Sequence, residues 1–436
     1  MCYLYAMNSA RYRKSIEFLT RAEKSIPLGS QTFSKSRTQY PVGVSPLFID
    51  RAKGTYVWDL DGNKYIDLVN GLAAITIGYQ NKKIDDAVRR QMKKGTIFSL
   101  PGTLEAEVAE LVIETVPSAE MVRFGKNGSD ATTAAVRLSR AYTGKSHVAF
   151  CGYHSWQDWY IGATSMNKGV PIEVSNLTHV FKYNDIESLK SIFSKYPNKV
   201  AAVILEPMSS EYPKDNFLQN VKKLANQNGS ILIFDEVVTG YRFSVGGAQS
   251  EFNVTPDLTT LGKGIANGYP LSVLAGKAEI MKDLESVFFS GTFGGELLSL
   301  AAAKTVINMH LKSDISKEIS AVGLNMAFEL ENIIQTHGLN DVLRISGHPT
   351  WKFMNWTETS ECSITMLKTY FMQEMFKRGV LVLSTHNNSL SLTNKIAQQV
   401  IHTYNEVITI LKKDIENSSV SRKLRAAPIR QLFSVR

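Results

Sequence analysis

The chain has 436 residues, of which 44% are hydrophobic and 20% are charged, and its formal net charge is +9. These values are ordinary for a globular protein, and the length allows one large and one small domain. Residues 1–6 lack the basic leader and apolar core of a secretory signal, and no apolar run approaches the roughly 20 residues that span a bilayer. We therefore expect a cytoplasmic protein with no membrane partner.

Cysteine and histidine spacing gives no sign of a metal. Cys2, Cys151 and Cys362 are far apart, and no pair has the spacing of a zinc-binding or redox motif. The eight histidines form no His-x-x-x-His pair. Reduced thiols and no metal site are expected.

The first elements are short. Residues 9–26 have a helical pattern that ends at Pro27, residues 29–41 are polar and irregular, and residues 47–69 suggest short antiparallel strands. Helices are expected at about 83–94 and 103–116, the second with Thr103 as its N-cap.

A candidate anion site follows the strand at Val122–Phe124. The segment from Gly125 to Asp130 leads directly into a helix of small residues at 131–142. Free N–H groups at a helix start, with a glycine and a hydroxyl beside them, bind anions. The plainer alternative is a helix that Ser129 or Asp130 simply caps.

Further along, strands alternate with helices, which predicts a parallel sheet with right-handed crossovers. Buried strands are expected before Tyr153, at 200–205 before Glu206, and at 231–234 before Asp235 and Glu236. The carboxyl ends of such strands meet at one edge of the sheet, which is where ligands bind. A helix is expected near 215–228, and later helices at about 314–336, 363–378 and 393–415.

Lys263 stands between Gly262 and Gly264, which leaves room for a bulky group near the backbone. A protected lysine and an aspartate at a strand end are what pyridoxal 5′-phosphate (PLP) requires. From chemistry alone, an acidic turn and a surface lysine are equally possible. A nucleotide P-loop is excluded, because Gly264 stands where that motif needs Ser or Thr.

The amino-acid sequence around Lys263 favours the PLP site over an acidic turn with a surface lysine. It resembles class III, fold type I PLP-dependent aminotransferases, and most closely the glutamate-1-semialdehyde 2,1-aminomutase branch. The resemblance rests on five segments: Phe234-Asp235-Glu236-Val237, Thr239-Gly240-Tyr241-Arg242, Gly246-Gly247-Ala248-Gln249, Val254-Thr255-Pro256-Asp257-Leu258 and Leu261-Gly262-Lys263.

This resemblance implies an α/β fold: a large domain with a mostly parallel sheet flanked by helices, and a small α+β domain built from both termini. The expected limits are 1–69 for the first part of the small domain, 70–310 for the large PLP-binding domain, 311–415 for the second part of the small domain, and 416–436 for a basic tail.

The resemblance also implies roles for single residues. Lys263 is expected to form a Schiff base with PLP and move a proton, Asp235 to hold the pyridine nitrogen, and Glu206 to lie near the ring hydroxyl and the substrate. The implied cofactor site consists of Asn127, Gly128, Ser129, Tyr153, His154, Asp235, Val237, Lys263 and Thr292, with Tyr153 stacked on the ring. In the family, the threonine at the position of Thr292 contacts the phosphate of the neighbouring subunit, so a homodimer with shared active sites is expected.

The residues expected to bind the substrate help to distinguish an aminomutase from an aminotransferase. Ser34 and Arg37 fall on the positions that bind the substrate carboxylate in aminomutases, although a surface arginine is the plainer reading. Three departures disfavour the aminomutase: the run 265–269 is not rich in glycine, Glu296 replaces an asparagine, and the segment 384–388 lacks an expected carboxylate.

We therefore expect an aminotransferase that moves an amino group between an amino donor and a small keto or aldehyde substrate, for example a sugar. The alternative is the aminomutase, which returns the nitrogen to the same carbon skeleton. A non-catalytic partner of the same fold is a different class of function. The retention of Lys263, Asp235, Gly128, Ser129 and Tyr153 argues against it.

The C-terminus is basic. The last fifteen residues contain no acid and five basic side chains: Arg422, Lys423, Arg425, Arg430 and Arg436. Such a tail suits nucleic acid or a membrane surface, but no nucleic-acid-binding motif accompanies it. A solvated or poorly ordered terminus is expected instead.

Overall fold

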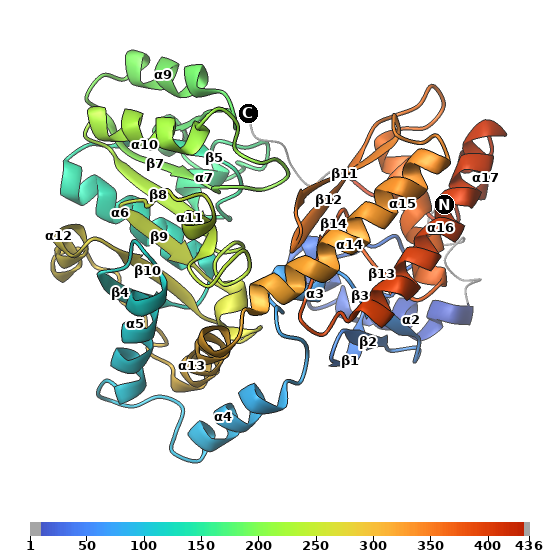
Figure 1. Ribbon diagram of the computed structural model, residues 1–436, viewed down its shortest axis with the longest axis horizontal. Helices are drawn as coiled ribbons and strands as arrows, with labels where there is room; N and C mark the ends of the chain where they lie inside the picture. Colours follow the sequence, from blue (N-terminus) through green and yellow to red (C-terminus); the bar gives the residue numbers. More distant parts are fainter. Residues whose placement is uncertain (1–9, 431–436) are drawn as a thin grey trace. The chain divides into compact units, whose positions relative to one another are not determined.

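The computed structural model describes residues 10–430 (Figure 1). Within them the chain forms two compact units. Unit 1 comprises residues 10–72, 78–80 and 318–430, and unit 2 comprises residues 73–77 and 81–317. The domain limits drawn from the sequence stay a prediction.

A sheet of seven strands is the centre of unit 2. Strand β10 runs antiparallel to both of its neighbours, β4 and β9, and all other pairs are parallel. The expected mostly parallel sheet is confirmed. The strands in spatial order are β4 (Met121–Gly125), β10 (Ser272–Gly276), β9 (Leu258–Leu261), β8 (Ile231–Glu236), β7 (Val200–Leu205), β5 (His147–Cys151) and β6 (Thr178–Val180).

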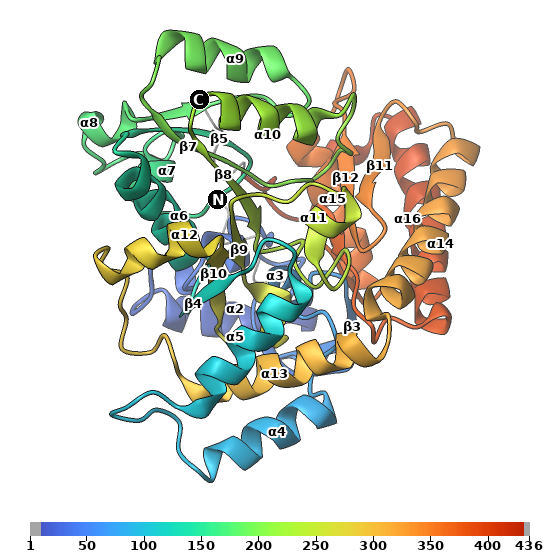
Figure 2. The ribbon, with the colours of Figure 1, turned by 60° about the vertical axis from the view of Figure 1, so that its left-hand side comes forward.

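Helices cover both faces of this sheet (Figure 2). Because side chains alternate along a strand, Ile231 and Ile233 of β8 pack with α6 (Gly128–Thr143) and α12 (Ala278–Met281). Leu232 and Phe234 pack on the opposite face with α9 (Ile186–Lys195) and α10 (Phe217–Gln227). Two cores thus hold β8 from both sides, which fixes the position of its carboxyl end.

Three further helices of unit 2 pack together: α4 (Lys82–Met92), α5 (Thr103–Thr115) and α13 (Leu297–Lys312). The N-cap of α5 is Gly102, whose N–H donates to Glu105 at 2.9 Å. The expectation of Thr103 as the cap is therefore wrong, because a carboxylate three residues later serves the helix start. The short elements of unit 2 are α7 (Asp158–Ile161), α8 (Ile172–Ser175), α11 (Gly247–Glu251), η4 (Lys263–Ala266) and η5 (Lys282–Glu285). Helix α3 (Asn70–Ala73) has residues 70–72 in unit 1 and Ala73 in unit 2.

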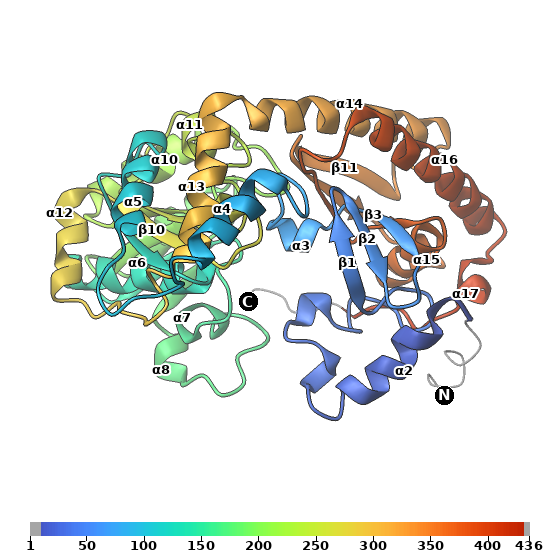
Figure 3. The ribbon, with the colours of Figure 1, turned by 90° about the horizontal axis from the view of Figure 1, so that it is seen from below.

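Unit 1 is an α+β unit built from both ends of the chain (Figure 3). One sheet joins β1 (Ile49–Lys53), β2 (Tyr56–Asp59) and β3 (Lys64–Asp67) to β13 (Val380–Leu381), which runs parallel to β3. A second sheet contains β11 (Leu343–His348), β12 (Trp351–Trp356) and β14 (Thr385–Asn387). The helices are η1 (Ala10–Tyr12), α2 (Arg13–Ala22), η2 (Pro27–Gly29), η3 (Phe33–Lys35), α14 (Ile315–Thr336), α15 (Ile364–Lys377), α16 (Asn394–Glu416) and α17 (Val420–Lys423).

The described part of the basic tail is ordered. The backbone N–H of Arg425 donates to Gln373, and that of Ile429 donates to Thr369, both at 2.9 Å. The segment is therefore bound to α15, which differs from a poorly ordered terminus, while the side chains of Arg425 and Arg430 are exposed as expected. Arg436 and Cys2 lie outside the described residues. No helix between residues 10 and 430 has the length and apolarity to cross a membrane.

Candidate functional site

Lys263 is the first residue of η4, directly after β9. Its φ of +42° lies in the left-handed region, which costs energy for any residue with a Cβ and is typical of functional sites. Within residues 10–430 its ammonium group has neither a hydrogen bond nor an ion pair. Burial lowers the pKa of this group, and the charges of Glu206 and Asp235 raise it again in part. The structure thus holds a lysine whose neutral, nucleophilic form is favoured.

Asp235 is the second-to-last residue of β8, and its side chain is almost fully buried. Oδ1 accepts hydrogen bonds from the backbone N–H of Val237 and from the hydroxyl of Thr260, both at 3.2 Å. Thr260 lies directly opposite Asp235 in the parallel pair of β8 and β9. The sequence analysis did not predict Thr260. Placing β8 and β9 side by side in parallel register would have identified it, because Thr260 is the partner of Asp235.

His154 orients Asp235. Its Nδ1 lies 2.7 Å from Oδ2 of Asp235, and its Nε2 lies 3.1 Å from the carbonyl oxygen of Cys151. Because a carbonyl oxygen only accepts, Nε2 donates, and a further proton lies between Nδ1 and the carboxylate. The imidazole ring stacks on Trp159 and is fully enclosed. The predicted site residue His154 therefore contacts Asp235, and it holds that carboxylate from the α6 side of the sheet.

Glu206 follows β7 and faces the same strand ends. Its Oε2 accepts the backbone N–H of Tyr153 at 3.0 Å. Burial raises the pKa of this carboxyl, and the charge of Asp235 raises it further. Gly152 makes the approach possible: its φ is +104°, and a Cβ there would lie 2.6 Å from Oε2 of Glu206. The ring of Tyr153 is half-exposed and meets Tyr160 edge-on.

The start of α6 differs from the expected arrangement. Its N-cap is Asn127, in extended conformation, rather than Ser129 or Asp130. The carboxylate of Asp130 turns back and accepts the N–H groups of Lys126 and Asn127 at 3.0 and 2.8 Å. The N–H groups of Gly128 and Ser129 have no acceptor among residues 10–430, so they remain available for an anion.

The side chain of Val237 lies between the start of α6 and Gly262, the residue before Lys263. A Cβ on Gly128 would lie 2.9 Å from Cγ1 of Val237, and one on Gly262 would lie 3.2 Å from the same methyl group. The side chain of Val237 therefore packs between two glycines. Only residues without a side chain let the helix start and the segment before Lys263 approach it this closely.

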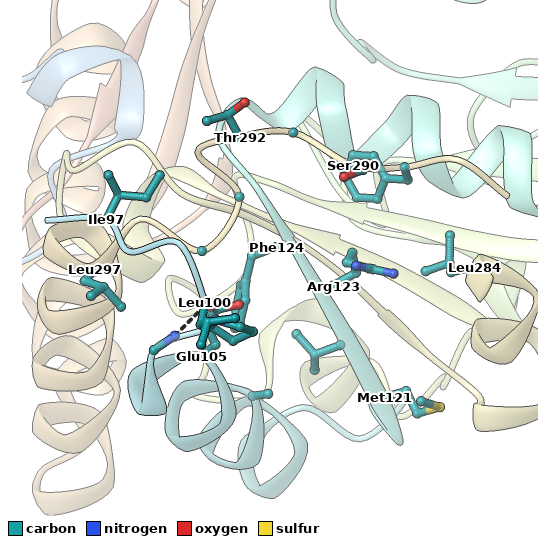
Figure 4. Close-up of a pocket in the computed structure, with 18 of the residues that line it drawn as sticks. Ile97, Leu100, Glu105, Met121, Arg123, Phe124, Leu284, Ser290, Thr292 and Leu297 are labelled. Atoms are coloured by element: carbon teal, nitrogen blue, oxygen red, sulfur yellow. Dashed lines mark hydrogen bonds between the residues drawn. The ribbon is translucent and has the colours of Figure 1, made fainter. Parts of the chain in front are cut away.

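Thr292 lies in the exposed loop 290–295 before α13 (Figure 4). The loop borders a cavity of about 730 Å³, whose other walls include Leu100, Phe124 and Leu297. Neither Lys263 nor Asp235 lines this cavity. Glu296, the residue that departs from the family pattern, accepts the N–H groups of Leu298 and Ser299 at the start of α13 and pairs with Lys126 at 3.1 Å.

The predicted substrate residues lie in unit 1. Ser34 is in η3, and the guanidinium of Arg37 forms an ion pair with Glu23. In the polar segment 384–388, the side-chain amide of Asn387 donates to the carbonyl of Val69 at 2.8 Å, and His386 bonds to Tyr404. These groups have partners inside unit 1.

Arg242 is a further residue that the predicted site omitted. It is fully buried, its Nη2 donates to the carbonyl of Ala73 at 2.9 Å, and burial lowers its pKa to about 10. Its charge also lowers the pKa of Lys263. The only signal in the sequence was its place in the segment Thr239–Arg242 of the resemblance.

PLP fits this set of groups. Among residues 10–430 the amine of Lys263 has no hydrogen bond or ion pair, and the N–H groups of Gly128 and Ser129 have no acceptor that would compete with a phosphate. The carboxylate of Asp235 lies at a strand end. When bound, PLP supplies an electron sink for carbanion charge. In the described residues no cluster of three or more His, Cys, Asp or Glu side chains exists that would hold a metal.

The comparisons with known proteins agree with this geometry. The family model for aminotransferase class-III matches residues 39–413. The chain is 35% identical over 382 residues to the 3-aminobutyryl-CoA aminotransferase of Cloacimonas acidaminovorans (strain Evry), which covers 86% of this chain and 91% of that protein. It is 40% identical over 340 residues to the glutamate-1-semialdehyde 2,1-aminomutase of Alkaliphilus oremlandii (strain OhILAs), over 74% of this chain and 80% of that protein.

Among solved structures, the FumI protein of Sphingopyxis sp. MTA144 superposes with a TM-score of 0.86 at 25% identity, over 95% of this chain and 98% of that one. The chain therefore belongs to the class-III aminotransferase family. It has the fold type I architecture and is a PLP-dependent enzyme of that class. The predicted family, fold, cofactor and enzyme class are confirmed.

Proposed function

We propose that the protein is an intermolecular aminotransferase of the cytoplasm, which moves an amino group from an amino donor to a small keto or aldehyde substrate. One observation carries the proposal: within the described part of the chain the amine of Lys263 has no hydrogen bond or ion pair, burial lowers its pKa, and the charges of Glu206 and Asp235 act on it. A lysine of this kind attaches a carbonyl group and then moves a proton.

The proposed roles follow from the contacts. Lys263 holds the cofactor and moves the proton. Asp235, oriented by His154, accepts the N–H of the cofactor ring. Glu206 lies beside the ring hydroxyl and the substrate, and the exposed face of Tyr153 covers the ring. Asn127, Gly128 and Ser129 bind the phosphate at the start of α6.

The choice of an intermolecular reaction rests on the relative from Cloacimonas, which is named an aminotransferase, and on the polar segment 384–388. The aminomutase is the second candidate, because the relative from Alkaliphilus is 40% identical. In either reaction Ser34 and Arg37 bind the substrate carboxylate only if Arg37 exchanges its partner Glu23 for that carboxylate.

Two measurements test the proposal. We expect Lys263→Ala to lose the visible absorbance of the PLP-loaded protein and to lower activity about 10²–10⁴-fold, while Lys182→Ala, on an exposed lysine, leaves both unchanged. Normal turnover by Lys263→Ala would overturn the proposal. A screen of amino donors then separates the candidates: turnover of glutamate-1-semialdehyde with no second substrate would assign the protein as an aminomutase.

A homodimer belongs to the same proposal. Large apolar side chains are exposed at the cavity beside Thr292: Ile97, Phe98 and Leu100 line it, and Phe293 belongs to the loop that borders it, with Leu100 79% and Phe293 59% exposed. Patches of this kind mark interfaces. A second copy of the chain would cover the patch and bring Thr292 to the phosphate of its partner. Light scattering tests this: Leu100→Glu with Phe293→Glu should yield monomers, and a monomeric wild-type protein would contradict it.

A further inference from the structure

A second cavity in unit 2, distinct from the one beside Thr292, lies between α4 and α13. Its volume is about 700 Å³. Both helices pack on each other and lie side by side in Figures 2 and 3. No residue of the proposed cofactor site lines this cavity. We call it the basic groove, after the six cationic side chains that line it: Lys83, Arg90, Lys93, Lys94, Lys304 and Lys312.

No carboxylate lines the basic groove. Lys304 pairs with Glu107 of α5, which also feels the charge of Lys94. Within the described residues, none of the other five basic side chains forms an ion pair. The acids of α4, Asp85 and Asp86, are engaged elsewhere, with Lys82 and Arg89. Around one concave surface, five cations therefore lie without an ion pair to any described residue, and such a surface attracts an anion.

Helix termini explain only part of this charge. Arg90 lies in the last turn of α4, Lys93 is the C-cap of α4 and Lys312 ends α13, positions where cations interact favourably with the helix dipole. Lys83 lies in the first turn of α4, where the dipole disfavours a cation, and yet it lines the groove. A solvated helix face would not require Lys83 on the side that faces α13.

The size of the groove decides the class of ligand. A volume of about 700 Å³ is in the range of pockets for small molecules. Lysine and arginine together recognise phosphate oxygens, the arginine by two parallel hydrogen bonds. The residues between the cations, Thr305 and Asn308 of α13, offer neutral hydrogen-bonding groups. We propose that the basic groove binds a small anion that carries a diphosphate group, either free or as part of a nucleotide. This inference does not depend on the proposed substrate.

Calorimetric titration of the PLP-loaded protein with inorganic pyrophosphate tests the proposal. The loaded protein is used because the cofactor then occupies the start of α6. We expect the triple variant Lys83→Gln, Arg90→Gln, Lys94→Gln to bind pyrophosphate at least tenfold more weakly than the wild type. The matched control is Lys168→Gln, Lys182→Gln, Lys223→Gln, which removes the same charge from exposed sites of unit 2 and should bind normally.

Further ligands distinguish the two sources of the diphosphate. ADP or coenzyme A binding more tightly than pyrophosphate, with the same loss in the groove variant, would assign a nucleotide; equal binding would assign the free anion. No binding by the wild type, or equal weakening in both triple variants, would overturn the proposal. Binding of DNA or anionic vesicles without binding of pyrophosphate would overturn it as well. Unchanged melting temperature and absorbance of the cofactor check that both variants are folded.

Discussion

The two carboxylates at the end of β8 are neighbours in sequence, yet they occupy two different regions of the molecule. Asp235 lies on the face of the sheet that α6 covers, and Glu236 lies on the opposite face. Glu236 accepts four hydrogen bonds: from Thr239, from the backbone of Ala248, and from the backbone and side chain of Gln249. Asp235 has three contacts, with Val237, Thr260 and His154.

This difference decides the role of each acid. An ionised carboxylate has about four acceptor positions. All four of Glu236 are filled by protein donors, so Glu236 joins β8 to α11 and has nothing left for a ligand. Within the described residues Asp235 forms only three hydrogen bonds, which leaves one acceptor position for a ligand. Both acids are buried, but they differ in their hydrogen bonds. Asp235 has an acceptor position that no protein donor fills, and Glu236 has none.

The largest expected effect comes from a substitution of Asp235, which removes the carboxylate that is available to a ligand. We predict that Asp235→Asn lowers kcat/KM about 10²–10³-fold, the usual effect of removing one group that stabilises charge in a transition state. The amide has the same shape, so the fold and the melting temperature of the cofactor-free protein should change little. Steady-state kinetics with saturating PLP measures it. Full activity of Asp235→Asn would remove the distinction between the two acids.

The matched substitution of Glu236, on the opposite face of the sheet, should lower stability and leave activity largely unchanged. We predict that Glu236→Gln lowers the free energy of unfolding by about 3 kcal/mol, because the new NH₂ group points at N–H donors in a buried site. Folded protein at 25 °C should retain most of its activity. Urea denaturation of the cofactor-free protein measures the change. A large loss of activity with unchanged stability would show that Glu236, too, belongs to the chemistry.

Val237, the next residue, offers a prediction of intermediate size. We predict that Gly128→Ala destabilises the protein by about 1–3 kcal/mol through overpacking against the methyl groups of Val237, and weakens PLP binding. Combining it with Val237→Ala should restore part of both, since the clashing methyl groups are then absent. A double-mutant cycle of unfolding free energies and PLP dissociation constants measures the coupling. Additive effects would contradict the proposed packing.

The sequence predicted that Lys263, Asp235, Glu206 and Tyr153 lie at one edge of the sheet, because each is at the end of a buried strand, directly after one, or directly after a glycine. Parallel strands of one sheet end at one edge, so local patterns were sufficient to bring these residues together. The limits of α4, α5, α10, α14, α15 and α16 follow for the same reason, because apolar spacing and end signals are local, whereas α9 and α13 were not predicted.

Two contacts that the sequence analysis did not predict join residues that are distant in the chain. The ion pair of Arg37 with Glu23 joins residues 14 apart through an irregular loop. The tail is ordered by α15, some fifty residues upstream. Neither contact leaves a periodic pattern in the sequence. The misplaced N-cap of α5 is different, because Glu105 turns back to Gly102 only three residues away.

The smallest expected effect concerns the third acid of the edge. Burial raises the pKa of Glu206 above its ordinary value of 4.5, so the folded protein binds more protons than the unfolded one as the pH rises beyond that value. The free energy of unfolding then falls with increasing pH in that window. Glu206→Gln lacks this titrating group, so the variant should become more stable relative to the wild type as the pH rises from 4.5 towards neutrality.

Chemical denaturation of the cofactor-free proteins over this range measures the difference. Glu110→Gln, on an exposed acid of α5, is the control and should follow the wild type. A pH-independent difference between Glu206→Gln and the wild type would mean that Glu206 is solvated like Glu110. In that case, of the two acids whose charges act on Lys263, Asp235 alone would be buried.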